Sequence, residues 1–189
     1  MSDSRVNPLR TLLLAYSPSD GIEQEHHAAM LAFLENTANP LSRDTPEGHI
    51  TASCLAIHPI DASMVVLWHK KIGRWLQPGG HVEDTDASVA DASQRELCEE
   101  TGAIATDIDK FLGIVDIDVH PIPTHKDQPE HLHYDVRFGF VMSASWEPGE
   151  GSQWMPAAEV VATLDPPTAR LGRKVLQLRN HETISSHQS

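Results

Sequence analysis

Short segments in which apolar and polar residues alternate predict strands in the middle of the chain. Residues 50–58 and 64–69 are rich in β-branched side chains, and a turn at residues 59–63 separates them, which favours a hairpin. Further strands are expected at residues 111–121 and 131–138, where polar positions recur at every second residue. The alternation therefore predicts four strands that can share one sheet.

Helical periodicity precedes and follows these strands. Residues 5–16 carry a leucine stripe, and a second helix is expected from about residue 20 to 35, where Asp20 and Glu23 resemble a capping box. Residues 1–45 are therefore expected to form a helical extension with its linker, which either packs on the sheet or makes a homodimer contact. Helices at 156–164 and from 166 or 167 to about 180 are expected to close the chain, before a polar tail at 183–189.

The segment from residue 76 to 103 contains the densest group of acidic residues. It opens with the turn Pro78-Gly79-Gly80, where backbone carbonyls are accessible, and a helix is expected to follow. Thr85 or Asp86 can cap this helix, and Gly102 is suited to end it. Small or apolar residues recur every four positions and predict its buried face: Val89, Ser93 and Leu97.

Three carboxylates lie close together near the end of this helix. Glu96, Glu99 and Glu100 are three and four residues apart, so they project from neighbouring positions on one face. Like charges at this spacing cost about 0.2–0.5 kcal/mol per pair in water. A hard divalent cation, which takes oxygen ligands, would relieve the repulsion. The alternative is a solvated acidic face, supported by an i,i+4 pair between Arg95 and Glu99.

These residues resemble the signature of the Nudix hydrolases. That signature is Gly, five residues, Glu, seven residues, and then Arg-Glu-aliphatic-x-Glu-Glu-x-Gly-aliphatic. Gly80 matches its first glycine, and the second half is matched by Arg95, Glu96, Leu97, Glu99, Glu100 and Gly102. Two positions depart from it. Asp86 replaces the first glutamate and is separated from the arginine by eight residues, and Ala103 stands at the last aliphatic position.

The resemblance implies an α/β protein with the Nudix α/β/α sandwich and a mixed β-sheet, covering residues 46–182. It also implies hydrolysis of a pyrophosphate bond in a nucleoside diphosphate linked to another group, with Mg²⁺ as the cofactor and Mn²⁺ as a substitute. Such hydrolysis needs an activated water and charge neutralised on phosphate oxygens, which metal ions held by carboxylates supply. The expected metal ligands are Glu96, Glu99, Glu100 and the carbonyl of Gly80.

Other residues have expected roles around this metal site. Arg95 should orient a glutamate through a charge-assisted hydrogen bond. The general base is expected to be a glutamate of the signature or a residue of the loop before residue 153, where Glu150 and Glu147 are the candidates. These assignments predict a site assembled from one helix and a later loop.

Two groups of residues are candidates for binding the phosphates of the substrate. Lys71 and Arg74 belong to the densest basic cluster of the chain, although an exposed hairpin tip would also explain them. On residues 131–138 the alternation places four polar side chains on one face, namely His131, His133, Asp135 and Arg137. This face either lines the substrate pocket, with Arg137 and His133 as ligands, or is an open face with an Asp–Arg pair. A transition-metal site at its two histidines is a third alternative.

Composition limits the partners of the chain. Its 189 residues carry a formal net charge of −13, which opposes binding to nucleic acid and anionic membranes. The resemblance implies a small-molecule phosphoanhydride as the partner, and an acidic chain then needs local positive charge at the phosphate site. No stretch is long and apolar enough for a membrane span, and two cysteines, Cys54 and Cys98, indicate no disulfide framework, which favours the cytoplasm. Two other functions stay open: a Nudix-fold isomerase of isoprenyl diphosphates, which needs a catalytic cysteine, and a non-catalytic nucleotide-sensing module.

Overall fold

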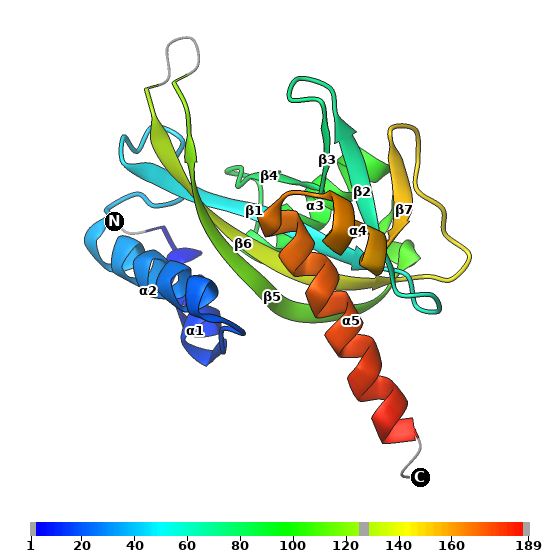
Figure 1. Cartoon of the computed structure of the whole chain (residues 1–189). Helices are drawn as coiled ribbons and strands as arrows, with labels where there is room; N and C mark the ends of the chain where they lie inside the picture. Colours follow the sequence, from blue (N-terminus) through cyan, green and yellow to red (C-terminus); the bar gives the residue numbers. More distant parts are fainter. Residues whose placement is uncertain (1–2, 125–128, 187–189) are drawn as a thin grey trace. The chain divides into compact units, whose positions relative to one another are not determined.

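The computed structural model describes residues 3–124 and 129–186, which form helices and one sheet. The predicted α/β class, the mixed sheet and the N-terminal helices are confirmed. The hydrogen-bonded strand order is β3-β2-β1-β6-β5, with β4 paired to β1 and β7 paired to β2 (Figure 1). The strands are β1 (Gly48–Ile57), β2 (Ser63–His69), β3 (Arg74–Leu76), β4 (Gly79–His81), β5 (Ile108–Ile122), β6 (His131–Met142) and β7 (Ser152–Pro156).

Five α-helices and one 3-10 turn flank these strands in the described part of the chain. They are α1 (Val6–Ala15), α2 (Gly21–Asn36), α3 (Val89–Thr101), η1 (Ala105–Asp107), α4 (Ala157–Thr163) and α5 (Pro166–Ser186). The predicted hairpin is confirmed, because β1 and β2 are antiparallel with Ile57 opposite Met64. Helix α5 runs past its predicted end near residue 180 and into the segment predicted as a polar tail; residues 187–189 lie outside the described part.

The chain divides into two compact units. The first unit comprises Met1–Ser53, Gly79–Glu96 and Gly113–Phe138. The second comprises Cys54–Pro78, Leu97–Leu112 and Gly139–Ser189. Several strands and α3 are continuous in sequence across this division, so each unit takes part of the sheet. The N-terminal helices cluster with strand segments of the first unit. The predicted bounds of the domain, 46–182, stay a prediction.

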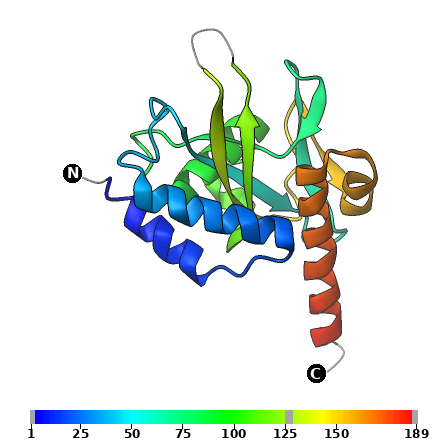
Figure 2. The same ribbon diagram turned by 60° about the vertical axis from the view of Figure 1, so that its left-hand side comes forward.

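In the first unit, α1 and α2 lie side by side (Figure 2), and α2 packs on β5 and β6. Phe33 of α2 stacks on Tyr134 of β6, with ring centroids 4.0 Å apart. Asp20 caps α2 as predicted, since its carboxylate accepts a hydrogen bond from the Glu23 N–H at 2.8 Å. Glu23 itself is buried and accepts from the Ile117 N–H of β5 at 3.2 Å. The N-terminal helices were expected either to pack on the sheet or to make a homodimer contact, and the structure shows packing on the sheet.

In the second unit, β2 pairs with β3 on one side and with β7 on the other. Helices α4 and α5 pack against each other closely at Gly172, where an added Cβ would lie 2.8 Å from the carbonyl oxygen of Ala157. Trp68 of β2 donates its backbone N–H to the carbonyl of Gly151 at 2.9 Å, which ties the loop before β7 to this unit.

Helix α3 begins and ends through local hydrogen bonds. The Ser88 hydroxyl accepts from the Asp91 N–H at 3.1 Å, and the Ser88 carbonyl accepts from the Ala92 N–H at 3.1 Å. Ser88 is therefore the N-cap, and the prediction of Thr85 or Asp86 was wrong. At the other end Gly102 has φ +75° and donates to the carbonyl of Cys98 at 3.0 Å, as expected for the residue that ends a helix.

Candidate active site

Helix α3 carries the acidic residues singled out in the sequence. Its predicted inner face is confirmed, because Val89, Ser93 and Leu97 are at most 2% exposed. The Ser93 hydroxyl satisfies its burial by donating to the carbonyl of Ser53 at 2.8 Å. On the other side of the helix Glu96 is half-buried, while the next acids along the chain are exposed, namely Glu99 and Glu100.

Gly80 lies directly against the Glu96 carboxylate. Strand β4 pairs antiparallel with β1, with Gly80 opposite Ala52 and Gly79 opposite Ser53. A Cβ added to Gly80 would lie 2.5 Å from Cδ of Glu96 and 2.7 Å from its Oε2. Only a residue without a side chain leaves room for the carboxylate here. The backbone of the glycine turn at Gly80 and the carboxylate of Glu96 are therefore in direct contact.

Arg95 bonds to the Glu96 carboxylate, as the sequence predicted. Its Nη1 donates to Oε1 of Glu96 at 2.9 Å, and its Nη2 donates to the carbonyl of His81 at 2.9 Å. Its Nε donates to Oδ1 of Asp86 at 2.9 Å, and Asp86 also accepts the Glu83 N–H at 2.7 Å. Burial alone would raise the pKa of the Asp86 carboxyl, but these bonds outweigh it and lower that pKa. Asp86 therefore stays ionised and serves as a partner of Arg95.

The N-terminal extension also contacts this loop, which the sequence did not predict. The Arg5 guanidinium donates to the backbone carbonyl of Glu83, and to that of Asp86 at 3.1 Å. Its charge is balanced by Asp3, at 2.7 Å. Nothing in the hydrophobic pattern points to Arg5, because the contact joins segments about eighty residues apart in sequence. The loop between β4 and α3 is thus held from two sides, by Arg95 and by Arg5.

The loop that carries Glu147 and Glu150 is tied to the end of α3 in the second unit. The Gly149 N–H donates to the carbonyl of Thr101 at 2.8 Å, and a side chain at Gly149 would collide with that oxygen. Both glutamates are exposed. The tertiary structure thus brings this loop to the residue that follows Glu100.

The expected basic residues lie in the second unit. A turn at residues 70–73 joins β2 to β3, and Arg74 begins β3 opposite His69. Lys71 and Arg74 are both exposed. The exposed hairpin tip, which the sequence offered as the other explanation of these basic residues, is therefore present.

Arg137 does not have the position expected of a substrate ligand. Its side chain is 2% exposed and bonded within the first unit, with Nε 2.8 Å from Asp135 and Nη1 2.9 Å from Asp116. Its Nη2 lies 3.4 Å from Asp118. Burial alone would lower the pKa of Arg137, but the three carboxylates outweigh it and raise that pKa. The predicted Asp–Arg pair is present, but the face that carries it is buried and not open. Asp116 and Asp118 of β5 share the same guanidinium with Asp135.

His133 lies in a group of histidines whose members come from several strands. Burial, and then the neighbouring imidazoles, lower the pKa of His133 to about 2. His49 and His81 have their pKa lowered to about 4, again chiefly by burial. A neutral imidazole offers phosphate a hydrogen bond and no charge, so His133 could bind a phosphate without balancing its charge.

The model of one protein family, the NUDIX domain, matches residues 47–178. That match covers more than half of the chain and includes the glycine turn, α3 and the loop before β7. The chain belongs to the Nudix family. It is therefore a Nudix hydrolase, a pyrophosphohydrolase acting on phosphoanhydride bonds. No curated protein matches the sequence.

Solved Nudix structures resemble this chain in fold. The C. elegans Ap4A hydrolase superposes with a TM-score of 0.53 at 12% identity, over 68% of this chain and 96% of its own. The E. coli dihydroneopterin triphosphate pyrophosphohydrolase gives 0.53 at 13% identity, over 66% and 92%. The M. smegmatis Nudix hydrolase RenU gives 0.50 at 14% identity, over 70% and 87%. At these identities the likeness concerns the fold alone.

Nudix hydrolases generally use divalent metal ions, and the donors of this chain fit such an ion. The carboxylate of Glu96 lies against the backbone of Gly80 in a space that any side chain would fill. Hard divalent cations take carboxylate and backbone carbonyl oxygens, which are the donors present here. No helix in the described residues combines the length and the apolar character that crossing a membrane requires.

Proposed function

We propose that this Nudix hydrolase cleaves a pyrophosphate bond in a nucleoside diphosphate linked to another group. The observation that carries the proposal is the contact between Gly80 and the Glu96 carboxylate, which Arg95 holds in place. A carboxylate held in place beside the glycine backbone supplies an oxygen donor without the reorganisation that a mobile side chain would need. The proposed ligands of the ion are Glu96, Glu99, Glu100 and the carbonyl of Gly80.

Mg²⁺ is the proposed ion, with Mn²⁺ as a substitute, and it would neutralise phosphate charge and lower the pKa of a bound water. The residues of the chain do the rest. Arg95 orients the Glu96 carboxylate, because it donates to it at 2.9 Å. Glu150, on the loop tied to Thr101, is the proposed general base, with a signature glutamate as the other candidate. Lys71 and Arg74 remain proposed phosphate ligands, while Arg137 is excluded by its burial.

The reaction class is tested by incubating the full chain with a panel of phosphoanhydrides. The panel contains nucleoside triphosphates, dinucleoside polyphosphates, ADP-ribose, NADH and coenzyme A, each with Mg²⁺, with Mn²⁺ and with a chelator. Cleavage that needs the metal, with products whose masses identify a broken P–O–P bond, supports the proposal. Absence of cleavage across the whole panel would contradict it and favour the nucleotide-sensing alternative.

The isomerase alternative finds no support in the two cysteines. Cys54 is fully buried, and its Sγ lies 3.5 Å from the carbonyl oxygen of Pro78. Cys98 is half-buried, and burial, followed by the charges of Asp107 and Glu99, raises the pKa of its thiol. A catalytic cysteine needs an accessible group with a lowered pKa, and neither thiol meets both conditions.

Substitution of Gly80 by alanine is expected to lower kcat by about 10²-fold or more with little loss of stability. The new Cβ would displace the Glu96 carboxylate, and the end of a glutamate side chain moves at small cost. Steady-state rates on the best panel substrate and urea unfolding measure the two effects.

The matched control for this variant is Gly79→Ala. There the Cβ would lie 2.6 Å from Cα of Ser53 on β1, so backbone must move and stability should fall. If Gly80→Ala kept full activity, the Glu96 carboxylate would not be the ligand proposed here.

A further inference from the structure

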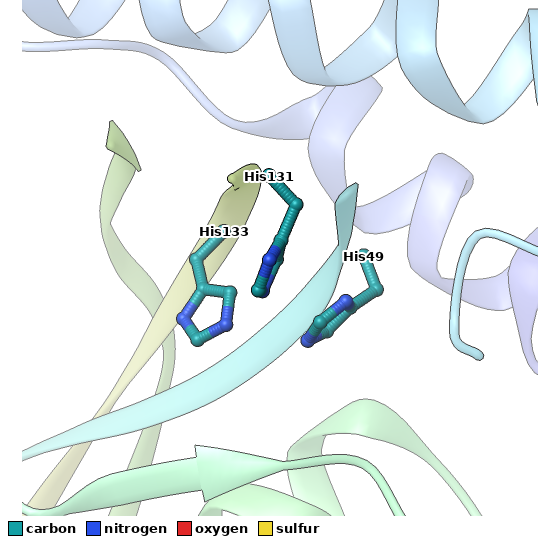
Figure 3. Close-up of side chains that lie close together, drawn as sticks. All are labelled: His49, His131 and His133. Atoms are coloured by element: carbon teal, nitrogen blue, oxygen red, sulfur yellow. The ribbon is translucent and has the colours of Figure 1, made fainter. Parts of the chain in front are cut away.

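Three histidines from two strands come together in the first unit. His49 lies on β1, and His131 and His133 lie two residues apart on β6, so they share one face of that strand. Figure 3 shows the three side chains gathered over these strands, and one ring nitrogen from each lies within 4.8 Å of the others. The ring centroids of His49 are 5.1 Å from His131 and 4.7 Å from His133.

Gly48 permits this assembly. A Cβ on Gly48 would lie 2.9 Å from the carbonyl carbon of Leu132, which separates the two histidines of β6. The Leu132 N–H donates to the carbonyl of Glu47 at 3.1 Å, which sets β6 beside the start of β1. The imidazole of the next residue, His49, is thereby carried to the two imidazoles of β6. Pairing between β1 and β6 brings the three histidines together. Alternation within β6 alone could indicate only the two histidines on that strand.

His49 is buried without a partner for its polar atoms. Its side chain is 1% exposed, and neither Nδ1 nor Nε2 has a hydrogen-bond partner among the residues that the structure describes. Leaving a buried polar group unsatisfied destabilises the fold, so such groups are rare without a functional reason. The unsatisfied nitrogens of His49 lie at the same place as the ring nitrogens of His131 and His133. A ligand that accepts imidazole lone pairs would remove this penalty.

His131 already has the orientation that metal ligands have. Its Nδ1 lies 2.9 Å from the carbonyl oxygen of Pro129. A carbonyl can only accept, so Nδ1 carries a proton, and the neutral form of this imidazole has its lone pair on Nε2. Histidines that bind metals usually donate their other ring N–H to a carbonyl or carboxylate in this way.

We propose that His49, His131 and His133 form a binding site for one transition-metal ion of the zinc type, separate from the carboxylate site on α3. Imidazole nitrogens suit zinc and its neighbours in the periodic table, whereas Mg²⁺ prefers oxygen. In a tetrahedral centre with Zn–N bonds of 2.0–2.1 Å, ligand nitrogens are about 3.4 Å apart. The present spread of up to 4.8 Å is wider than that value, and binding of the ion would draw the three imidazoles together.

The fourth ligand of this ion would be either His81 or a molecule from solution, such as water or a substrate. Three histidines with an open position are the ligand set of zinc sites that bind water or a substrate. The His81 ring lies 5.0 Å from that of His49 and 5.2 Å from that of His133, so it can either complete the set or stay beside it. Because His81 follows Gly80 and its carbonyl binds Arg95, the site lies next to the glycine turn.

Zinc binding to the full chain tests this proposal without substrate. Metal-free protein is titrated with Zn²⁺ by calorimetry in excess Mg²⁺, and a separate metal-free sample is loaded with Co²⁺ to record its ligand-field spectrum. One ion per chain is expected, with a tetrahedral Co²⁺ spectrum containing nitrogen ligands. His131→Gln and His133→Gln should each weaken Zn²⁺ binding by at least about 10–100-fold.

Two control variants separate this site from others. His58→Gln removes a histidine that pairs with Asp61 and contacts Trp154, and Glu100→Gln removes a proposed ligand of the carboxylate site. Neither should change Zn²⁺ affinity. Absence of binding to the wild type, or unchanged binding in both β6 variants, or its loss in Glu100→Gln, would each overturn the proposal. Since the readout is metal binding, failure of the proposed hydrolase activity would not affect this result.

His49 is tested by the thermal stability of His49→Leu. Without metal this variant should be at least as stable as the wild type, because it removes a buried imidazole that lacks partners. Zn²⁺ should raise the Tm of the wild type by mass action and leave that of His49→Leu unchanged. An equal Zn²⁺-dependent rise in both proteins would exclude His49 as a ligand.

Discussion

Replacement of Glu100 by glutamine is expected to lower kcat by about 10²–10³-fold, the effect of removing one electrostatic contribution to the transition state. The amide keeps the shape of the side chain but removes the negative charge that holds a divalent cation. Glu100 is exposed near the end of α3, so the fold should be unchanged. Steady-state kinetics on a confirmed substrate, at several Mg²⁺ concentrations, measure the loss.

The matched control for this variant is Glu159→Gln, which removes an exposed glutamate from the first turn of α4, away from the signature. It should keep its activity. A Glu100→Gln enzyme that keeps near wild-type kcat would show that the metal assignment on α3 is wrong. Recovery of part of the lost rate at high Mg²⁺ or Mn²⁺ would support a weakened metal site, because mass action compensates for lost affinity.

Replacement of Arg137 by methionine is expected to lower the free energy of unfolding by about 3–5 kcal/mol, as for other buried ion pairs that lose one partner. The variant leaves Asp116, Asp118 and Asp135 buried with no guanidinium between them; all three are at most 2% exposed. Urea unfolding at neutral pH measures this effect. Arg173→Met is the control, because Arg173 is exposed on α5 and its loss should change stability by about 0.5 kcal/mol or less.

The pH dependence of this variant follows from the same carboxylates. Without Arg137, three buried carboxylates repel one another in the folded state and destabilise it at neutral pH. The deficit should shrink at acid pH, because protons taken up by the carboxylates remove the repelling charges. A variant as stable as the wild type, but with a raised KM, would instead return Arg137 to the substrate site.

Local sequence was sufficient for much of the fold because local physics decides it. Strand alternation, a glycine at the end of α3 and an aspartate at the start of α2 act within a few residues, and those predictions are confirmed. The N-cap of α3 was missed although its signal was present. Ser88 and Asp91 have the spacing of a capping pair, and Asp86 looked equally suited until its bond to Arg95 was known.

The face of β6 illustrates the limit of periodicity. Alternation correctly grouped four polar residues on one side of the strand, but it carries no information about what the neighbouring strands present to that side. Two aspartates of β5 are 2.9 and 3.4 Å from the Arg137 guanidinium, and they make it a buried cation. His49 of β1 does the same for the two histidines, turning a pair on one strand into a group of three.

The features of the two proposed sites differ in what determines them. Residue types and spacing along one helix indicated the Nudix family and an acidic face suited to a divalent cation, because both follow from contacts three and four residues apart. The contact of Gly80 with Glu96, the anchoring of the loop by Arg5 and the three-histidine group depend on segments distant in sequence. Chain folding alone decides which of these segments meet, since pairing between strands is specified by the whole sheet and not by any one strand.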